Sequence, residues 1–393
     1  MRIVELSAFV AAPLAGATLA SLGAEVIRID PPAGPIDANR WPLHNGRSLY
    51  WAGLNQGKKS VLIDTRSEAG RELVTALIAK AGAVLTNLPV REWNAYERLS
   101  ENRPDLIMAI LTGNADGSPA VDYTVNAATG FPFVTGPEGH VGPVNHVLPA
   151  WDALAGYMLT TAMVAAELYR LRTGAGQCIR LSLSDVALSI AGHLGLIAEA
   201  QLDPEPRPRI GNELFGTFAR DFRTSDGKYV IAVALTPDQW RNLVAATGIG
   251  DAVARLEAEH GVDLREEGAK FELRKQIAGL LEPWIAARPL AAVREEFDRH
   301  HVLWGPYQTF KELAENDPRC SGANPMFAVV DQPEIGRYLR AASPLLFSGS
   351  ERLSPRPSPD LGEHTAEVIG SWLGQSRREI QLLEAKGVAK TAG

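Results

Sequence analysis

Along the first 115 residues, short apolar runs alternate with segments in which apolar side chains recur every three or four positions. Short apolar runs are typical of buried strands, and the three-to-four spacing is typical of helices. The helical segment 67–82 is marked at both ends, because Ser67 can cap its start and Gly82 can stop it. The strand-like runs lie at 2–6, 24–30, 59–64, 83–87 and 105–111.

This alternation predicts an α/β fold with a doubly wound, mostly parallel sheet, similar to the Rossmann fold. In such sheets, ligands bind at the carboxyl ends of the strands. A long helix from about 152 to 172 and a further strand within 176–183 continue the pattern.

The pattern changes after the proline-rich stretch at 203–209, which is the best candidate for a domain boundary. Two strands joined at Asp226-Gly227 follow, and then a helix at 236–248 with a capping box. We therefore expect a large domain over residues 1–200 and a smaller α+β domain over 210–325. The C-terminal segment, 326–393, has little core of its own and is expected to return to the large domain or to a partner subunit.

Composition narrows the classes of function. The net charge of −7 argues against nucleic acids or acidic membranes as the main partners. Cys178 and Cys320 are the only cysteines, too few for a disulfide framework or a zinc site, so we expect a cytoplasmic protein. The N-terminal residues do not resemble a signal peptide. The most apolar run, 147–169, contains two acidic residues and predicts a buried helix rather than a membrane span.

Several familiar catalytic signatures are absent, among them the phosphate loop, H-E-x-x-H, G-x-S-x-G and paired C-x-x-C. The first strand–helix turn, "SAFVAAPLAG", has alanines and a proline where a dinucleotide fold carries G-x-G-x-x-G. Without these glycines a pyrophosphate cannot approach the backbone closely. A nicotinamide-dependent enzyme is therefore not expected, although Asp30 ends the second strand as a ribose-binding acid would.

One acidic residue, Asp152, stands alone near the start of the long apolar helix. By position alone we favour a helix cap, because a carboxylate there accepts hydrogen bonds from free N–H groups. The alternative is a nucleophile, since the same surroundings keep the carboxylate ionised and aimed.

Three other groups of polar residues have both an ordinary and a functional interpretation. Lys58 and Lys59 form either a solvated basic turn or a phosphate site. Asn87, with Arg91 shortly after it, follows the fourth strand and either caps a loop or contacts a ligand. The segment from Arg40 to Arg47 is either a solvated loop or a partly buried site for a carboxylate.

Six segments, taken together and in this order, resemble the class III CoA-transferases, the family that includes formyl-CoA and carnitine CoA-transferases. The resemblance runs nearly from end to end, although no single segment is decisive. The segments are "AAPLAGATLASLGAEVIRID", "LNQGKKSVLID", "LTNLPV", "DYTVNAATGFPFVTG", "RTGAGQCIRLSLSDVAL" and "SPDLGEHTAEV".

The resemblance implies that Asp152 in "PAWDALAG" is the catalytic aspartate, which reverses the preference for a cap. Two departures stand out. Pro31 occupies the place of an adenine-pocket arginine, and the region 205–220 lacks the glycine-rich loop of the oxalate-handling members. The resemblance places the CoA site of the large domain at Val10, Ala11, Asn55, Lys58, Asn87, Leu88 and Tyr123, and we add Arg91.

Some segments, such as "DYTVN" and "VNHVLPAWD", resemble members that move CoA between the two carboxyl groups of one branched, unsaturated C4-backbone diacid, such as mesaconate. Such a reaction passes through an aspartyl anhydride and an aspartyl-CoA thioester. We expect Arg40, His44, Arg47, Asn145 and His146 to hold the free carboxylate.

The resemblance also implies an interlocked homodimer. No metal and no permanently bound cofactor are expected, since CoA arrives as part of the substrate. Two alternatives remain open at this point: transfer between two separate acids, and a CoA-binding protein without activity.

Overall fold

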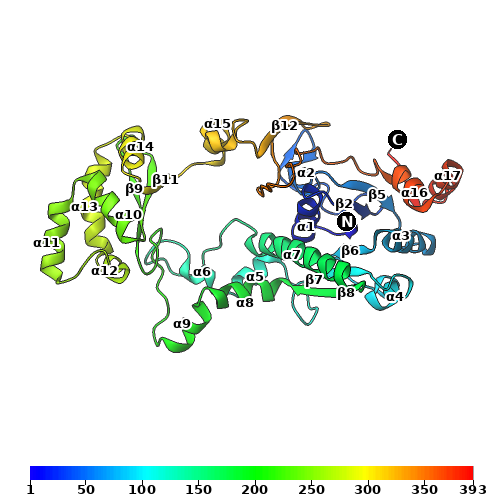
Figure 1. The fold of residues 1–393 in the computed structure, drawn as a ribbon, viewed down its shortest axis with the longest axis horizontal. Helices are drawn as coiled ribbons and strands as arrows, with labels where there is room; N and C mark the ends of the chain where they lie inside the picture. Colours follow the sequence, from blue (N-terminus) through cyan, green and yellow to red (C-terminus); the bar gives the residue numbers. More distant parts are fainter. Residues whose placement is uncertain (393) are drawn as a thin grey trace. The chain divides into compact units, whose positions relative to one another are not determined.

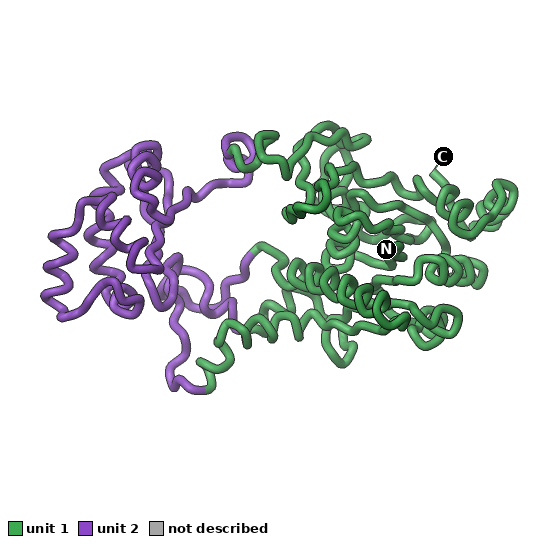
Figure 2. The backbone as a smooth tube through the Cα atoms, viewed as in Figure 1, with its two compact units in different colours: residues 1–129, 147–201, 318–393 green, residues 130–146, 202–317 purple. Residues whose placement is uncertain are grey.

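The computed structural model describes residues 1–392, which divide into two units (Figure 2). The larger unit comprises 1–129, 147–201 and the chain from Pro318 onward, and the smaller comprises 130–146 and 202–317. We expected the large domain to run unbroken to residue 200. Instead, 130–146 belongs to the smaller unit, because the Arg209 guanidinium binds the carbonyl groups of Pro132, His140 and Gly142.

The larger unit is built on a seven-stranded sheet in the order β14-β5-β2-β1-β6-β7-β8, in which every pair except β14–β5 is parallel. This confirms the predicted mostly parallel sheet. Its strands are β1 (Arg2–Leu6), β2 (Glu25–Asp30), β5 (Lys59–Ile63), β6 (Ala83–Thr86), β7 (Ile107–Thr112), β8 (Gln177–Ser182) and β14 (Ala389–Lys390). Two hairpins lie outside it, β3 (Leu43–His44) with β4 (Arg47–Ser48), and β12 (Phe327–Gln332) with β13 (Gly336–Ala341).

Helices cover both faces of this sheet, as Figure 1 shows. Along β1, Val4 and Leu6 pack in the core that α3 covers, whereas Glu5 faces α1. Ser67 caps α3 and Gly82 ends it with φ 70°, as predicted. The helices of this unit are α1 (Ala11–Ser21), α2 (Leu49–Leu54), α3 (Glu68–Ala81), η1 (Glu92–Asn94), α4 (Tyr96–Asn102), α5 (Asp122–Ala127), α7 (Ala150–Thr173), α8 (Leu183–His193), η2 (Pro318–Cys320), α16 (Thr365–Leu373) and α17 (Arg377–Ala385), with α9 (Leu196–Leu202) at its boundary.

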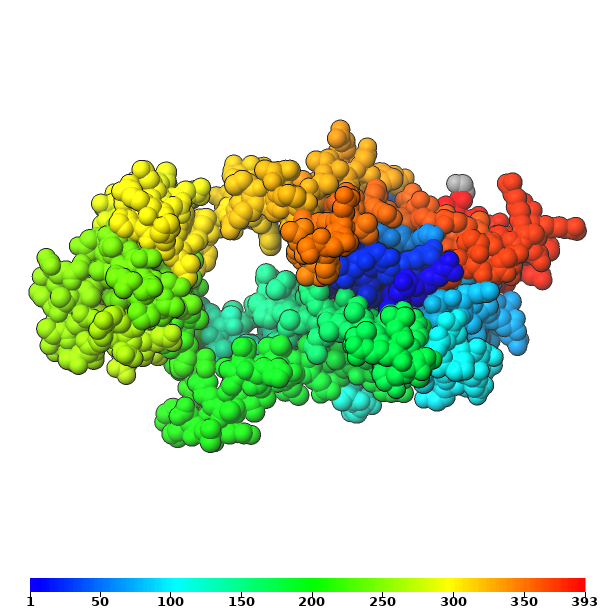
Figure 3. All heavy atoms as spheres, viewed as in Figure 1, coloured from blue at the N-terminus to red at the C-terminus, as the bar shows by residue number. Residues whose placement is uncertain are grey.

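The C-terminal segment packs back on the N-terminal part of the same unit. In Figure 3 the orange and red C-terminal residues lie against blue N-terminal ones. Strand β14 pairs with β5, and the Thr365 hydroxyl accepts a hydrogen bond from the Leu62 N–H. Val368, Ile369 and Trp372 of α16 join the same apolar core as α3.

The smaller unit has a three-stranded antiparallel sheet in the order β11-β10-β9, with helices packed against it. The predicted capping box at Thr236 and Gln239 is present at the start of α10. The strands are β9 (Phe218–Arg223), β10 (Tyr229–Ala234) and β11 (Leu303–Pro306). The helices are α6 (Phe131–Val134), α10 (Pro237–Thr247), α11 (Gly250–His260), α12 (Glu267–Glu272), α13 (Arg274–Ala286), α14 (Leu290–Arg299) and α15 (Phe310–Asn316).

Among residues 1–392, no single helix has both the length and the apolar composition required to cross a membrane. Only α8 and α9, bent by 64° at their junction, would meet that requirement as a pair.

Candidate active site

Asp152 is the third residue of α7, which begins at Ala150. The N–H groups of Trp151 and Asp152 donate to Oδ2 of Asp122, the first residue of α5, at 2.8 and 3.1 Å. A neighbouring helix therefore caps α7, and the interpretation of Asp152 as the cap is wrong. Because Asp122 accepts these N–H groups, the Asp152 carboxylate does not cap the helix and is available to react.

The surroundings of Asp152 make its carboxylate more basic than usual. Burial is the main cause and the charge of Asp122 the second, and together they raise its pKa to about 6, although the Arg40 guanidinium acts in the opposite direction. A group with this pKa is still mostly ionised at neutral pH. A carboxylate that is ionised and partly desolvated is a competent nucleophile.

The raised pKa predicts a measurable effect of the Asp152→Asn substitution on stability. The folded state favours the protonated carboxyl, so this contribution is complete below the ordinary value of 3.8 and is lost as pH rises through about 6. Above pH 6 the ionised carboxylate costs up to about 3 kcal/mol, a cost that asparagine does not carry. We expect the variant to melt several degrees higher at about pH 7.5 and to match the parent near pH 4. Thermal melts at both values test this, and a difference that does not depend on pH would contradict it.

Tyr50, in α2, is a residue that sequence reasoning missed. Burial, as the largest cause, raises its pKa to about 12, and the charges of Arg40 and Asp152 both act on it. Its hydroxyl is buried and has no hydrogen-bond partner among the described residues. A neutral phenol in this position can donate to an oxyanion. Tyr123, one of the predicted CoA residues, is half-exposed and also acts on Tyr50.

The predicted residues Val10 and Ala11 lie at the start of α1, and the structure brings this helix end close to Asp152. Gly156, one turn after Asp152 in α7, packs so closely on α1 that a Cβ there would lie 2.9 Å from the Ala11 carbonyl oxygen. No side chain caps α1, whose N-cap residue is Val10. The free N–H groups of a helix start favour negative charge.

The turn before α1 is held by side chains rather than by glycines. Asn87 donates to the Ala8 carbonyl at 2.8 Å and accepts from the Ala8 N–H at 2.9 Å. Asp37 accepts from the Phe9 N–H at 2.9 Å, and Phe9 has φ 67°, a conformation that bulky residues rarely adopt. Asn87 was predicted to contact CoA; its amide shapes this turn, and the contact with CoA stays a prediction.

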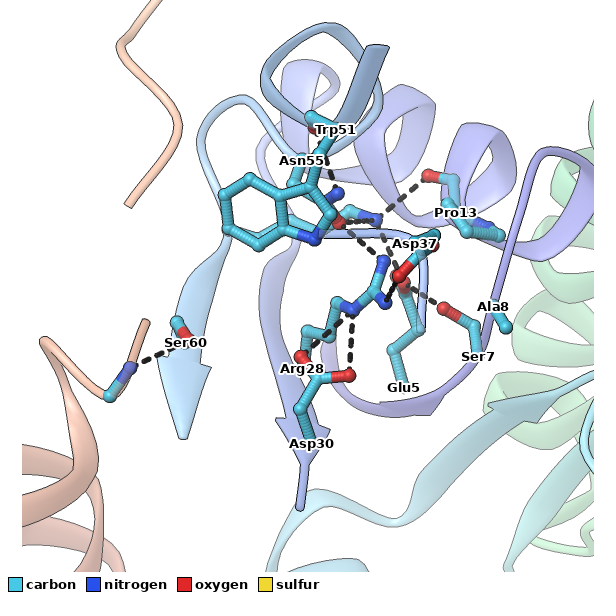
Figure 4. A network of polar contacts seen from close by, with 12 residues as sticks. Glu5, Ser7, Ala8, Pro13, Arg28, Asp30, Asp37, Trp51, Asn55 and Ser60 are labelled. Atoms are coloured by element: carbon cyan, nitrogen blue, oxygen red, sulfur yellow. Dashed lines mark hydrogen bonds and ion pairs between the residues drawn. The ribbon is translucent and has the colours of Figure 1, made fainter. Parts of the chain in front are cut away.

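Lys58 and Asn55 lie in a buried network of charged groups, most of which Figure 4 shows. Lys58 is 3% exposed, and its ammonium donates to Glu5 (2.8 Å), the Pro13 carbonyl (2.8 Å) and Asn55 (3.0 Å). Arg28 binds Asn55, Asp30 and Asp37 in the same network. All three hydrogens of the ammonium are used, so none is left for a phosphate, and the predicted CoA contact of Lys58 is corrected to a structural one.

A pocket of about 490 Å³ lies at the carboxyl edge of the sheet, beyond the ends of β1, β5 and β6. It contains two of the predicted CoA residues, Leu88 and Arg91. It also contains Arg66 and Arg71, which sequence reasoning missed although both follow the carboxyl end of β5. Arg66 is paired with Asp64 at 2.8 Å, and Trp93 adds an aromatic side chain to the lining.

Of the residues predicted to hold the substrate carboxylate, Arg40 acts electrostatically on Asp152. Its guanidinium lies over the rings of Phe9 and Tyr50, at 5.2 and 5.0 Å from their centroids. Arg47 forms an ion pair with Glu334 of the C-terminal segment, and His44 is exposed on the same small hairpin. Asn145 and His146 belong to the smaller unit.

The chain has similar proteins among characterised enzymes and solved structures. The chain is 51% identical to the 2-methylfumaryl-CoA isomerase of Chloroflexus aurantiacus over 99% of its own length and 96% of that protein. It is 28% identical to the succinyl-CoA–D-citramalate CoA-transferase of the same organism, over 99% and 97% of the two chains. A crystal structure of a CAIB/BAIF family protein from Brucella suis superimposes with a TM-score of 0.77 at 25% identity, over 95% and 98% of the two chains.

The sequence model of CoA-transferase family III matches residues 1–365. This match covers more than nine-tenths of the chain, including β1, the capped start of α7 and the pocket at the carboxyl edge of the sheet. The chain therefore belongs to CoA-transferase family III.

Proposed function

We propose that this enzyme isomerises 2-methylfumaryl-CoA (mesaconyl-CoA) by moving CoA from one carboxyl group of the diacid to the other. The observation that carries the chemistry is the partly desolvated carboxylate of Asp152, which does not cap its own helix because Asp122 does. The identity of the substrate is inferred from the relative that is 51% identical over nearly the whole chain.

The reaction that we infer exchanges one thioester for another and requires no ATP. An Asp152 oxygen attacks the thioester carbonyl carbon, the C–S bond breaks, and the thiolate leaves with the electron pair, giving an acyl–aspartyl anhydride. The thiolate then attacks the aspartyl carbonyl, which gives aspartyl-CoA and releases the diacid. The other carboxylate of the diacid then attacks the carbonyl carbon of aspartyl-CoA, which forms a second anhydride and expels the thiolate. The thiolate attacks the acyl carbon of this anhydride, which gives the isomerised thioester and regenerates the Asp152 carboxylate.

Each of these attacks places negative charge on a carbonyl oxygen. Two sets of donors near Asp152 suit it: the free N–H groups at the start of α1 and the neutral Tyr50 phenol. Fixed donors in a site that excludes water stabilise such an oxyanion without reorganising.

For the nucleotide end of CoA we propose the pocket with Arg66, Arg71 and Arg91. Three guanidinium groups around one pocket suit phosphates, to which arginine can bind with two hydrogen bonds. The Trp93 indole offers a face on which an adenine ring can stack. These residues would take the role of the arginine that lines the adenine pocket in the resembled CoA-transferases, at whose position this chain has Pro31.

For the free carboxylate of the diacid, we propose Arg40 as the principal cation. Its guanidinium acts electrostatically on Asp152 and lies on two aromatic rings, which holds it in place. Arg47 is a weaker candidate, because it already has a carboxylate partner in Glu334.

An isotope experiment tests whether transfer occurs within one molecule. Isomerisation of mesaconyl-CoA is run with an excess of ¹³C-labelled free mesaconate, and the product thioester is analysed by mass spectrometry. We expect no label in the product while isomerisation proceeds, because the diacid remains in the site while CoA is detached. Label entering as fast as product forms would instead establish transfer between separate acids.

A further inference from the structure

Asp122 is a buried carboxylate that no step above uses as a reactant. It is 2% exposed, and its Oδ2 accepts the N–H groups of Trp151 and Asp152. Its Oδ1 is buried and has no hydrogen-bond partner among residues 1–392. One turn later in α5, Asn126 accepts from the Trp151 indole N–H at 3.2 Å. The start of α7 is thus attached to α5 at two points, and only one of them carries charge.

We propose that Asp122 is a positioning residue that also promotes acylation of Asp152, because its fixed negative charge repels the ionised nucleophile and not the acylated one. This inference rests on the proposed role of Asp152 as the nucleophile.

The Asp122 carboxylate accepts two backbone N–H groups at the start of a 24-residue helix, the end at which the helix dipole attracts negative charge. Because those N–H groups are occupied, they do not hold the Asp152 carboxylate in an unreactive orientation. Asp122 therefore fixes the backbone of the nucleophile and leaves its oxygens free.

The repulsion between Asp122 and Asp152 changes during the first step of the reaction. When an Asp152 oxygen bonds to the thioester carbon and the C–S bond breaks, the negative charge leaves Asp152 with the thiolate. Two like charges become one on the protein, so the repulsion is relieved in the acyl-enzyme. The repulsion raises the free energy of the enzyme with a free Asp152 carboxylate and is partly relieved in the transition state of acylation. The barrier to acylation is therefore lower, since only interactions that differ between the ground state and the transition state change the rate.

Other groups that act on Asp152 within the larger unit set the size of this effect. Arg40 attracts the ionised carboxylate and offsets part of the repulsion, and Tyr50 is uncharged. Burial shifts the pKa of Asp152 more than Asp122 does. We therefore expect Asp122 to contribute about tenfold to the acylation rate, which corresponds to about one pKa unit.

The test separates the charge of Asp122 from its role as a cap. Asp122→Asn keeps an oxygen that can accept the N–H groups but removes the charge. Asp122→Glu keeps the charge, and Asp122→Ser is a second neutral variant with a common capping hydroxyl. Asn126→Ala, which loosens the same helix junction without changing charge, is the matched structural control. Measurements are the pH profile of kcat/KM, the single-turnover rate of acyl-enzyme formation by intact mass, and Tm.

We expect the acidic limb of the profile to move to lower pH by about one unit in the neutral variants, and their acylation rate to fall about tenfold. The Glu variant should keep the acidic limb of the parent enzyme. The Asn126→Ala control should have a lower Tm than the parent and the same acidic limb. Neutral and charged variants with the same limb and the same acylation rate would overturn the inference. That failure is distinct from failure of the proposed mechanism, in which the parent enzyme itself would form no adduct on Asp152.

Discussion

Replacing Asp152 by asparagine is expected to lower turnover by about three orders of magnitude or more while the protein stays folded. An amide is a poor nucleophile, so no anhydride forms, and loss of a catalytic nucleophile commonly costs at least this much. The start of α7 is not at risk, because its N–H groups donate to Asp122 and not to the replaced side chain. The higher Tm expected at neutral pH means that unfolding cannot explain the loss.

The measurement is kcat for mesaconyl-CoA isomerisation, with intact mass after mixing to detect acyl and CoA adducts. Asp152→Ala is the companion variant and should be equally inactive and free of adducts. Deamidation of asparagine would restore the aspartate, so the mass of the purified variant is checked first. An undeamidated Asn variant that retained a tenth of parental turnover would remove Asp152 from the mechanism.

The second large effect is on stability. Lys58→Met is expected to lower the free energy of unfolding by about 3–5 kcal/mol, the usual cost of breaking a buried ion pair by removing one partner. Glu5 is fully buried and one of its oxygens already has no hydrogen-bond partner in the described structure. Without the ammonium, its charge would remain packed against the backbone of α1, where a Cβ at Gly16 would lie 1.7 Å from the Glu5 Oε2.

Lys59→Met is the matched control, because Lys59 pairs with Glu25 and Glu367 at the surface and should contribute about 1 kcal/mol or less. Adding Glu5→Gln to Lys58→Met should recover part of the loss, since the uncompensated charge is then gone. Urea unfolding of all four proteins measures these differences. A Lys58 variant of parental stability that bound acyl-CoA poorly would restore the phosphate site that the sequence predicted.

The fold could be predicted where the local pattern carries the information. Strands such as β1 and β6 are continuous apolar runs, and α3 is marked by Ser67 and Gly82, so their positions follow from periodicity and capping. The segment 130–146 could not be assigned in this way. It joins the smaller unit through Arg209, more than sixty residues further along the chain, and no local pattern reports such a contact.

The candidate site divides in the same way. Asp152 stood out in the sequence because a carboxylate in an apolar run is unusual, whereas Asp122, Tyr50 and Arg71 have ordinary neighbours and acquire their roles only through tertiary contacts. Lys58 was assigned to a CoA phosphate because the sequence does not show that only one of two adjacent lysines is buried. In the structure the chain turns at 55–57 and β5 begins at Lys59, and the Lys58 ammonium lies inside the protein while that of Lys59 lies at the surface.

The return of the C-terminal segment to β5 has a consequence for the order of folding during synthesis. Val368, Ile369 and Trp372 cover the apolar side of α3, and β14 closes the edge of the sheet beside β5. Until residues 365–390 have left the ribosome, this side of the larger unit remains open to water and the edge strand has no partner. The smaller unit, whose core lies within 218–302, can form earlier, so a nascent chain would carry a finished small unit beside an unfinished sheet that chaperones would need to shield.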